Sequence, residues 1–382
     1  MMIDEHVKYW MALKSIEGIG NALFEALVRR FGSPAAVFDA DRRDLSAVAG
    51  SGAKIVDAVV SFRNMDGILR RLDALGRIGA SVITLDNEEY PFLLRNIFDR
   101  PVLLYVRGQL RKEDVTVAIV GSRHASAYGR YATDKISRDL ALRGVTVASG
   151  LARGIDSCAH RGALAARGRT LAVLGSGLDI VYPPENEKLL AEIIEQGAVL
   201  TEYPPQTQPL PHHFPARNRI ISGLSYGVVV VEAGEKSGSL ITARLAMEQG
   251  REVFAIPGPI DSASSRGAHH LIRQGAKLIE NADDILEEIL PQVQVVPATG
   301  AAADTQKTIP VASAETRSDG EKEALPEHEK NLLEMISRDK IHADELIAGS
   351  GLAAADVSSA LIRLELKGYV VQHPGKYFSS AK

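Results

Sequence analysis

One stretch of the sequence places an aromatic ring and two guanidinium groups where a helix is expected to begin. The stretch HFPARNRIISGLS covers residues 213–225 and contains Phe214, Arg217, Asn218 and Arg219. The chain before it is rich in proline, which predicts an extended, stiff arm that would hold the ring at a fixed place. Such a ring can stack on a nucleobase, worth about 1–3 kcal/mol, while the arginines and the asparagine reach the backbone. Because the bases of a single strand are free to stack, this chemistry suits a single strand better than a duplex.

The same residues have a purely structural interpretation. Phe214 could cover the core, and the two arginines could pair with Glu202 and Glu232, which follow predicted strands. The residues alone leave both interpretations open.

A second group of residues has the composition of an anion-binding site. The segments GSRHAS (121–126), SGLARGIDS (149–157) and GEKSGSLITA (234–243) each follow a predicted strand and open a helix. Glycine and serine at helix N-termini leave backbone N–H groups free to hold a phosphate, and nearby cations add charge. The candidate residues of these segments are Gly121, Ser122, Arg123, Arg153, Lys236, Ser237, Gly238 and Ser239. Arg266 adds a further guanidinium to the same rim, and acidic residues there imply some pairing.

The patterns of the common nucleotide enzymes are missing. After Gly175 and Gly177 the third glycine of a dinucleotide fingerprint is replaced by Ile180, and no P-loop occurs. Ser122 and Ser237 lack the surroundings of an activated nucleophile, and a histidine pair in a proline-rich arm is more often structural than catalytic. We therefore predict a binding protein with no catalytic residues, no cofactor and no metal site.

The loops that carry these residues must be positioned by an α/β fold. Short β-branched runs alternate with helix-period segments, which predicts a doubly wound, mostly parallel sheet of extended Rossmann-like type. The predicted strands are 116–121, 145–150, 170–175, 198–203, 227–233, 252–258 and 276–279. In such sheets ligands bind beyond the carboxyl ends of the strands, so the candidate residues should meet at one edge.

Two further domains are expected around this sheet. Residues 1–75 look helical, and the turn Gly18-Ile19-Gly20, echoed more loosely in 47–62, resembles a paired helix-hairpin-helix or SAM-like domain. The α/β domain should span 76–290, with 76–114 adding strands to one edge. A flexible linker is predicted for 291–325 from its alanine, threonine, serine and proline content.

The last segment, 326–382, has the order and size of a winged helix. Its recognition-helix position, 353–367, carries Arg363 and Lys367 but also Asp356 and Glu365. A helix that reads a DNA groove usually has a basic face, so packing or protein contact is the better prediction for this module.

Composition sets the wider limits. The 382 residues carry 44 Lys and Arg against 48 Asp and Glu, a formal net charge of −4, so a polyanion must be met by local clustering of cations. The single cysteine, Cys158, and the lack of a long apolar run predict a protein of the reducing cytoplasm with no membrane contact.

Six ordered motifs resemble the DNA-processing protein A family, also called DprA or Smf. They are AIVGSR (118–123), SGLARGID (149–156), GSGLDIVYPPEN (175–186), HFPARNRIISGLS (213–225), GSLITA (238–243) and PG (257–258). The match covers roughly residues 80–290, and the helical and winged-helix segments fit the family architecture. One minor departure is Ser176, where many members have cysteine or alanine.

The resemblance implies a role in DNA processing. Family members bind and protect single-stranded DNA, load the recombinase RecA onto it during natural transformation, and act as homodimers through the α/β domain. It places Arg123, Phe214, Arg217, Gly238 and Ser239 in the DNA pocket. For the dimer, the family's dimeric habit favours an apolar surface in 267–280, formed by His269, Leu271, Ile272 and Leu278, although such a stripe more often belongs to the core. A role in recombination at large, rather than in DNA uptake, stays open.

Two alternatives belong to other classes of function. Related α/β folds cleave nucleoside monophosphates, so the pocket could serve an enzyme, although the loop EAGEKSGSL lacks the expected glycine-rich spacing. In the other, the chain is mainly an adaptor whose winged helix recruits a partner.

Overall fold

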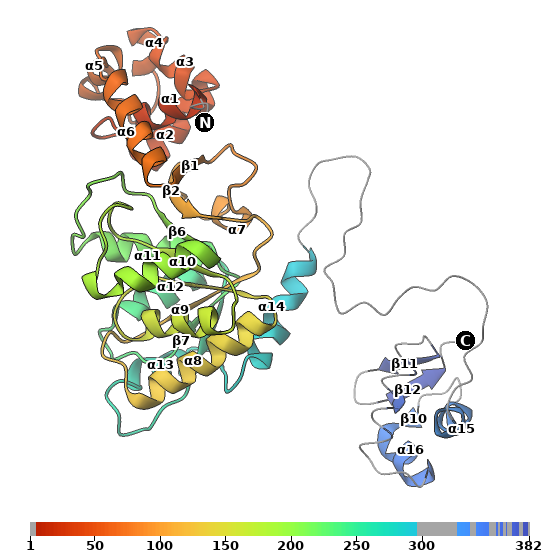
Figure 1. Cartoon of the computed structure of the whole chain (residues 1–382). Helices are drawn as coiled ribbons and strands as arrows, with labels where there is room; N and C mark the ends of the chain where they lie inside the picture. The colour runs from red at the N-terminus through yellow and green to blue at the C-terminus, as the bar shows by residue number, and fades with distance from the viewer. Residues whose placement is uncertain are drawn as a thin grey trace. The chain divides into compact units, whose positions relative to one another are not determined.

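The structure is a computed structural model that describes most of the chain. The described residues are 5–295, 327–336, 341–350, 357, 360–361, 364, 369–373 and 377–380. They belong to two compact units, one up to residue 300 and one from residue 301 (Figure 1).

A nine-stranded sheet forms the centre of the first unit, with the order β1-β2-β6-β5-β4-β3-β7-β8-β9. The strands from β6 to β9 in this order run parallel, whereas β1 and β2 are antiparallel additions at one edge. The strand bounds are β1 Ala80–Thr84, β2 Leu103–Gly108, β3 Thr116–Val120, β4 Thr146–Ser149, β5 Thr170–Val173, β6 Ala198–Thr201, β7 Gly227–Val230, β8 Glu252–Ala255 and β9 Lys277–Leu278. All seven predicted parallel strands are present, and 76–114 supplies the edge strands as expected.

The chain reverses its direction of travel across the sheet between β3 and β7. From β3 it proceeds through β4 and β5 to β6, then returns to the other side of β3 and continues through β7 to β9. Such a switch point opens a crevice beyond the strand ends, where ligands of open α/β sheets bind.

Helices cover both faces of the sheet. On one face lie α7 (Phe92–Arg95), α11 (His213–Gly223), α12 (Gly238–Glu248) and α13 (Arg266–Arg273). The other face is covered by α8 (Ala127–Leu142), α9 (Ile155–Ala165), α10 (Glu187–Gln196, preceded by the short helix η1, Pro184–Asn186) and α14 (Asp283–Val295). Alternate strand residues serve the two faces: Val117 and Ile119 contact one layer, Ala118 and Val120 the other. Both faces of each central strand are therefore buried, which is why these strands are continuous apolar runs.

The N-terminal part is helical, as predicted. Its helices are α1 (Glu5–Lys14), α2 (Asn21–Phe31), α3 (Pro34–Phe38), α4 (Arg42–Ser46), α5 (Ala53–Val60) and α6 (Met65–Arg77). Gly18 and Gly50 have φ angles of 92° and 91°, and Gly20 and Gly52 are the N-caps of α2 and α5. The two hairpins therefore share one turn geometry, which favours glycine because φ is positive.

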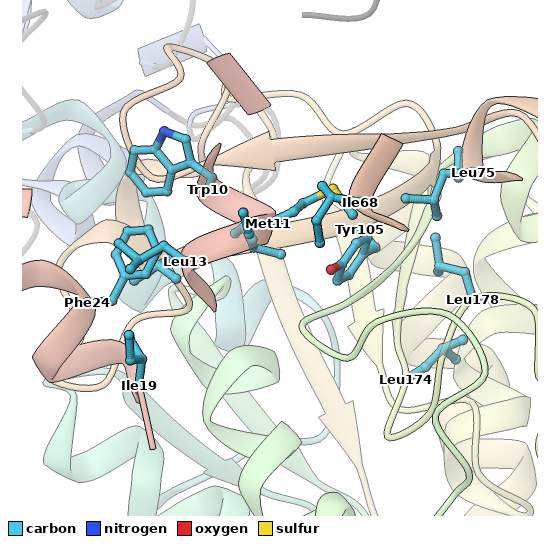
Figure 2. Packing of buried hydrophobic residues seen from close by; sticks show 14 of the residues in the cluster. Trp10, Met11, Leu13, Ile19, Phe24, Ile68, Leu75, Tyr105, Leu174 and Leu178 are labelled. Carbon is cyan, nitrogen blue, oxygen red and sulfur yellow. The ribbon is translucent and has the colours of Figure 1, made fainter. Parts of the chain in front are cut away.

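A continuous apolar core joins these helices to the sheet. Trp10 packs against Phe24 with ring centroids 5.0 Å apart, and the same cluster reaches Tyr105 of β2 and Leu174 after β5. Figure 2 shows these side chains meeting between the helices and the strands. The helical part is therefore packed onto the antiparallel edge and does not stand alone.

The boundary after the sheet differs from the predicted one. Helix α14 ends at Val295, so residues 291–295, assigned to the linker from the sequence, are helical and include Pro291. The rest of the predicted linker lies outside the described residues.

The second unit contains an antiparallel β-hairpin formed by two of its strands. Strands β10 (Ile341–His342), β12 (Tyr377–Ser380) and β11 (Val370–His373) form an antiparallel sheet, accompanied by α15 (Glu327–Met335) and α16 (Ala343–Ser350). The charged residues of the predicted recognition helix fall outside the described residues. Across the parts of the chain that the structure describes, no helix combines the length and apolarity needed to span a membrane.

Candidate nucleic-acid interface

A cavity of about 770 Å³ opens at the switch point of the sheet; we call it the strand-end pocket. Its lining residues are Val120, Gly121, Ser122, Arg123, Ala152, Asp156, Tyr182, Pro209, Pro211, Phe214, Pro215, Arg217, Asn218, Ile221, Gly234, Lys236, Ser237, Gly238, Ser239, Ile241 and Thr242. They come from segments that follow β3, β4, β5, β6 and β7. Ten of the twelve candidate residues, all but Arg153 and Arg219, line this pocket.

Aromatic rings and an arginine form one wall of the pocket. The Arg123 guanidinium carbon lies 5.5 Å from the centroid of the Phe214 ring, and the Tyr182 ring centroid is 5.7 Å from that of Phe214. Phe214 lies in the first turn of α11, so the helix holds the ring, and not an extended arm as predicted. It also packs over Gly175, where an added Cβ would be 2.9 Å from the ring. The half-buried ring and the exposed guanidinium together offer a stacking surface beside a cation.

The N-terminus of α12 forms another side of the pocket. Ser237 is the N-cap, and its Oγ accepts a hydrogen bond from the Ser239 N–H at 3.4 Å. Gly238 is exposed and has no atom within 4 Å of an added Cβ, so the backbone there is open to a ligand. Lys236 is exposed beside it. The open backbone of Gly238 at a helix N-terminus and the neighbouring ammonium of Lys236 are suited to a phosphate.

Arg217 is part of the pocket floor but is buried, with 4% of its surface exposed. Its Nη1 donates to the carbonyl oxygens of Gly150, at 2.7 Å, and of Val173. Burial lowers the pKa of Arg217 to about 10, while the charge of Asp156 opposes this effect. Burial likewise raises the pKa of Asp156, and Arg217 opposes it. This arginine holds the ends of β4 and β5, a role that motif composition did not reveal.

Arg219 does not line the pocket. It is 8% exposed and forms a bidentate ion pair with Glu202, at 2.6 and 2.7 Å, and a second pair with Asp99 at 2.9 Å. Burial alone would lower its pKa, but its hydrogen bonds and charge interactions with these two acids raise it. The structural interpretation is therefore correct for Arg219 and Glu202. It is wrong for Glu232, whose carboxylate accepts hydrogen bonds from the backbone and hydroxyl of Ser126.

The remaining arginines of the rim are paired at the surface. Arg153 forms a half-exposed ion pair with Glu185 and borders a small neighbouring cavity that Arg123 and Phe214 also line. Arg266 lies 3.6 Å from Glu235 and does not line the strand-end pocket. The structure thus places Arg153 beside the pocket and Arg266 outside it.

The two histidines of the arm differ in their surroundings. His213 is buried, stacks on Tyr203 with centroids 4.1 Å apart, and has its Nδ1 3.1 Å from the Gly175 carbonyl oxygen. His212 is exposed at the surface. No cluster of His, Cys, Asp or Glu that could hold a metal occurs among the described residues.

Sequence reasoning missed Tyr182 as a pocket residue and treated Asp156, in the segment SGLARGIDS, only as one of the acidic residues near the rim. Tyr182 lies in the loop GSGLDIVYPPEN, where an aromatic residue before two prolines was the available signal. Asp156 is in the first turn of α9, and its charge interaction with Arg217 depends on how α9 and α11 pack.

The predicted dimer stripe is only partly at the surface. Leu271 is 4% exposed and belongs to the core beneath α13, so it cannot line an interface as predicted. Ile272 packs partly against the same core, and the Nε2 of His269 is 3.0 Å from the Gly258 carbonyl oxygen. Leu278 is 44% exposed on β9, the last strand of the sheet order.

Family models match three parts of the chain. The model described as DNA recombination-mediator protein A matches residues 81–290, more than half of the sequence. The DprA winged helix domain matches residues 316–376, and the SAM-like helix-hairpin-helix tandem matches residues 11–63. The predicted combination of a helical hairpin domain, a Rossmann-like sheet and a winged helix is confirmed.

Curated relatives cover the chain at substantial identity. Protein Smf of Synechocystis sp. is 35% identical over 392 residues, which cover 98% of this chain and 98% of that protein. Protein Smf of Escherichia coli is 42% identical over 301 residues, which cover 78% of this chain and 76% of that protein. DNA processing protein DprA of Streptococcus pneumoniae is 50% identical over 200 residues, which are 52% of this chain and 71% of that protein.

Two solved structures are similar to this one. DNA processing protein A from Streptococcus pneumoniae matches with a TM-score of 0.61 and 38% identity, covering 76% of this chain and 99% of that chain. DNA processing protein A from Helicobacter pylori, whose structure concerns its single-stranded DNA binding mode, matches with a TM-score of 0.50 and 32% identity over 56% of this chain and 96% of that chain. The resemblance drawn from the motifs is confirmed, and the chain belongs to the DNA recombination-mediator protein A family, the DprA or Smf family.

Proposed function

We propose that this chain binds single-stranded DNA in the strand-end pocket, protects it, and loads RecA recombinase onto it during natural transformation or homologous recombination. The observation that carries the DNA part is the Arg123 guanidinium beside the half-buried Phe214 ring, with Tyr182 next to it. A Helicobacter pylori relative with the same fold is named for single-stranded DNA binding, which supports the proposal.

The geometry of the pocket favours a single strand over a duplex. A base can stack on Phe214 only if it is free of its partner strand, because the ring lies within a walled cavity and not on a flat surface. Arg123, Lys236 and the N-terminus of α12 then hold the phosphates on either side of that base.

The chain would act by binding and without a catalysed reaction. The named relatives and solved structures give no support to cleavage of a nucleoside monophosphate. Binding of a fluorescent oligo-dT, with a matched duplex and AMP as competitors, tests this. We expect the duplex and AMP to displace the oligonucleotide weakly; efficient displacement by AMP would instead indicate a mononucleotide site.

RecA loading is the finer part of the proposal and rests on family membership. RecA filament formation on oligo-dT in the presence of this chain measures it directly. Deleting 326–382 separates the loader from the adaptor alternative: unchanged loading rules the adaptor out, whereas complete loss with intact DNA binding favours it.

Self-association through the β9 edge is also proposed, now centred on Leu278. A Leu278→Asp variant should shift a dimer to monomer in sedimentation experiments while leaving the melting temperature nearly unchanged, since the side chain is 44% exposed. An unchanged dimer would place the interface elsewhere.

The cytoplasmic location inferred from the sequence stays a prediction.

A further inference from the structure

The floor of the strand-end pocket contains a buried carboxylate beside the buried guanidinium. Asp156 and Arg217 are 8% and 4% exposed, and both line the cavity. They come from different helices, Asp156 from the first turn of α9 and Arg217 from α11. No ion pair joins them among the described residues, but their opposite charges interact across the pocket floor, which lowers the cost of burying each one.

Both side chains form hydrogen bonds with the backbone of Gly150. The Oδ2 of Asp156 accepts hydrogen bonds from the N–H groups of Gly150, at 3.1 Å, and Ala152, at 3.4 Å. Arg217 donates to the Gly150 carbonyl oxygen at 2.7 Å. An added Cβ at Gly150 would be 2.5 Å from the Arg217 Nη1, so a larger residue at this place would displace the guanidinium.

The balance of charge is the feature with a functional consequence. The hydrogen-bond acceptors of Arg217 are uncharged backbone carbonyls, and Asp156 is the acidic group whose charge acts most strongly on it across the floor. The Arg217 Nε is buried and has no hydrogen-bond partner among the described residues. Removal of the Asp156 charge would therefore leave a free cation in the pocket wall.

The rim differs from the floor in this respect. Arg123 and Lys236 are exposed, and within the described residues neither forms an ion pair. A phosphate at the rim thus meets an unbalanced cation, whereas a phosphate at the floor would meet one positive and one negative charge.

We propose that Asp156 is a charge-compensating residue of the DNA pocket, whose carboxylate cancels the charge of Arg217. The phosphate backbone then meets a neutral floor, and the rim cations set the salt dependence of binding. Asp156 thereby lowers the affinity of the pocket for phosphate and keeps the strand exchangeable. This inference rests on the proposed function.

The test compares how the affinity for oligo-dT changes with salt in the wild type, Asp156→Asn, and the double variant Asp156→Asn/Arg217→Gln. For single strands the slope of log K against log salt is about −0.7 per phosphate neutralised. Asp156→Asn should bind more tightly at low salt, with a slope steeper by about 0.7. The double variant, in which both charges are removed, should return to the wild-type slope.

The outcomes separate this role from a purely structural one. If Asp156 only supported the fold, Asp156→Asn would reduce the affinity for oligo-dT by the same factor at every salt concentration, and the salt slope would not change. That result would show that the inference is wrong. If thermal melting shows that Asp156→Asn is unfolded, the double variant decides, because it has no unbalanced buried charge. A wild-type slope supports the inference, and a slope shallower by about 0.7 overturns it, because Arg217 then neutralises a phosphate in the native protein.

The wild-type measurement separates the inference from the proposed function. Absence of oligo-dT binding by the wild type would overturn both. Wild-type binding in the pocket with the wrong pattern of slopes would overturn the inference alone.

Discussion

The rim and the floor of the strand-end pocket contain the same kinds of cation but differ in how each charge is balanced. At the rim, Arg123 and Lys236 are exposed and face the cavity without an acidic partner among the described residues. At the floor, Arg217 is buried, tied to backbone carbonyls and balanced by Asp156. The proposed function therefore assigns the phosphate contacts to the rim cations and not to Arg217.

Arg219 extends the comparison away from the pocket. It lies two positions after Arg217 on α11, yet it pairs with Glu202 and Asp99 and lines no part of the cavity. We call the Arg219–Glu202 ion pair the outer pair. Changes at the rim should alter the salt dependence of binding, changes at the floor should alter the charge of the pocket, and changes at the outer pair should alter the stability of the fold.

The largest expected effect is on stability and comes from the outer pair. Arg219→Ala leaves the carboxylate of Glu202 buried without its partner, so the free energy of unfolding should fall by about 3–5 kcal/mol. Denaturant unfolding measures this loss. Arg153→Ala is the matched control, because its pair with Glu185 is half exposed and should contribute no more than about 1 kcal/mol. Equal losses in the two variants would contradict the distinction between the pairs.

The next effect is a pH dependence of stability from a histidine beneath the floor. Burial, together with the charges of Arg217 and Arg161, lowers the pKa of His160 to about 3. Because this pKa is below that of the unfolded chain, the unfolded state binds more protons, so stability is complete above pH ~6.5 and falls as the pH decreases. The loss should approach about 1.4 kcal/mol per pH unit below this point, and it should disappear in a folded His160→Leu variant. An identical pH profile in that variant would assign the loss to other groups.

The third effect concerns the stacking wall of the pocket. Phe214→Ala should weaken oligo-dT binding by about 1–3 kcal/mol, or roughly 5- to 150-fold, with an unchanged salt slope because no charge is removed. Phe98→Ala is a suitable control, since Phe98 is fully exposed but does not line the pocket. Equal affinity of both variants would show that the ring does not stack on a base.

The smallest effect is the one that characterises the rim. Arg123→Gln should reduce the steepness of the salt slope by about 0.7, corresponding to one phosphate contact. Arg266→Gln should leave the slope unchanged, because Arg266 is paired with Glu235 outside the pocket. A reduced slope in Arg266→Gln would extend the DNA path beyond the rim.

The fold was predictable because local patterns agree with the tertiary structure. Buried parallel strands are continuous apolar runs, and the loops after them carry the glycine and serine that open helix N-termini, so both the sheet and the position of the pocket follow from sequence. Phe214 and the α12 N-terminus were identified for the same reason.

The roles of individual arginines were not predictable in this way. Arg217 and Arg219 lie two positions apart in one motif, and because each helical residue rotates by about 100°, they point toward different neighbours. Whether each meets a carbonyl, an acid or a cavity depends on how β4, β6 and the segment around Asp99 pack against α11. Leu271 illustrates the same limit, because an apolar stripe has one pattern whether it faces the core or a partner.

The most direct test of the central claim is photo-crosslinking of an oligo-dT that carries one 5-iodouracil, with the crosslinked residue identified by mass spectrometry. The account predicts crosslinks to Phe214 or Tyr182, the aromatic wall of the strand-end pocket. Crosslinks confined to residues 11–63 or 316–376, the helical hairpins or the winged helix, would contradict it.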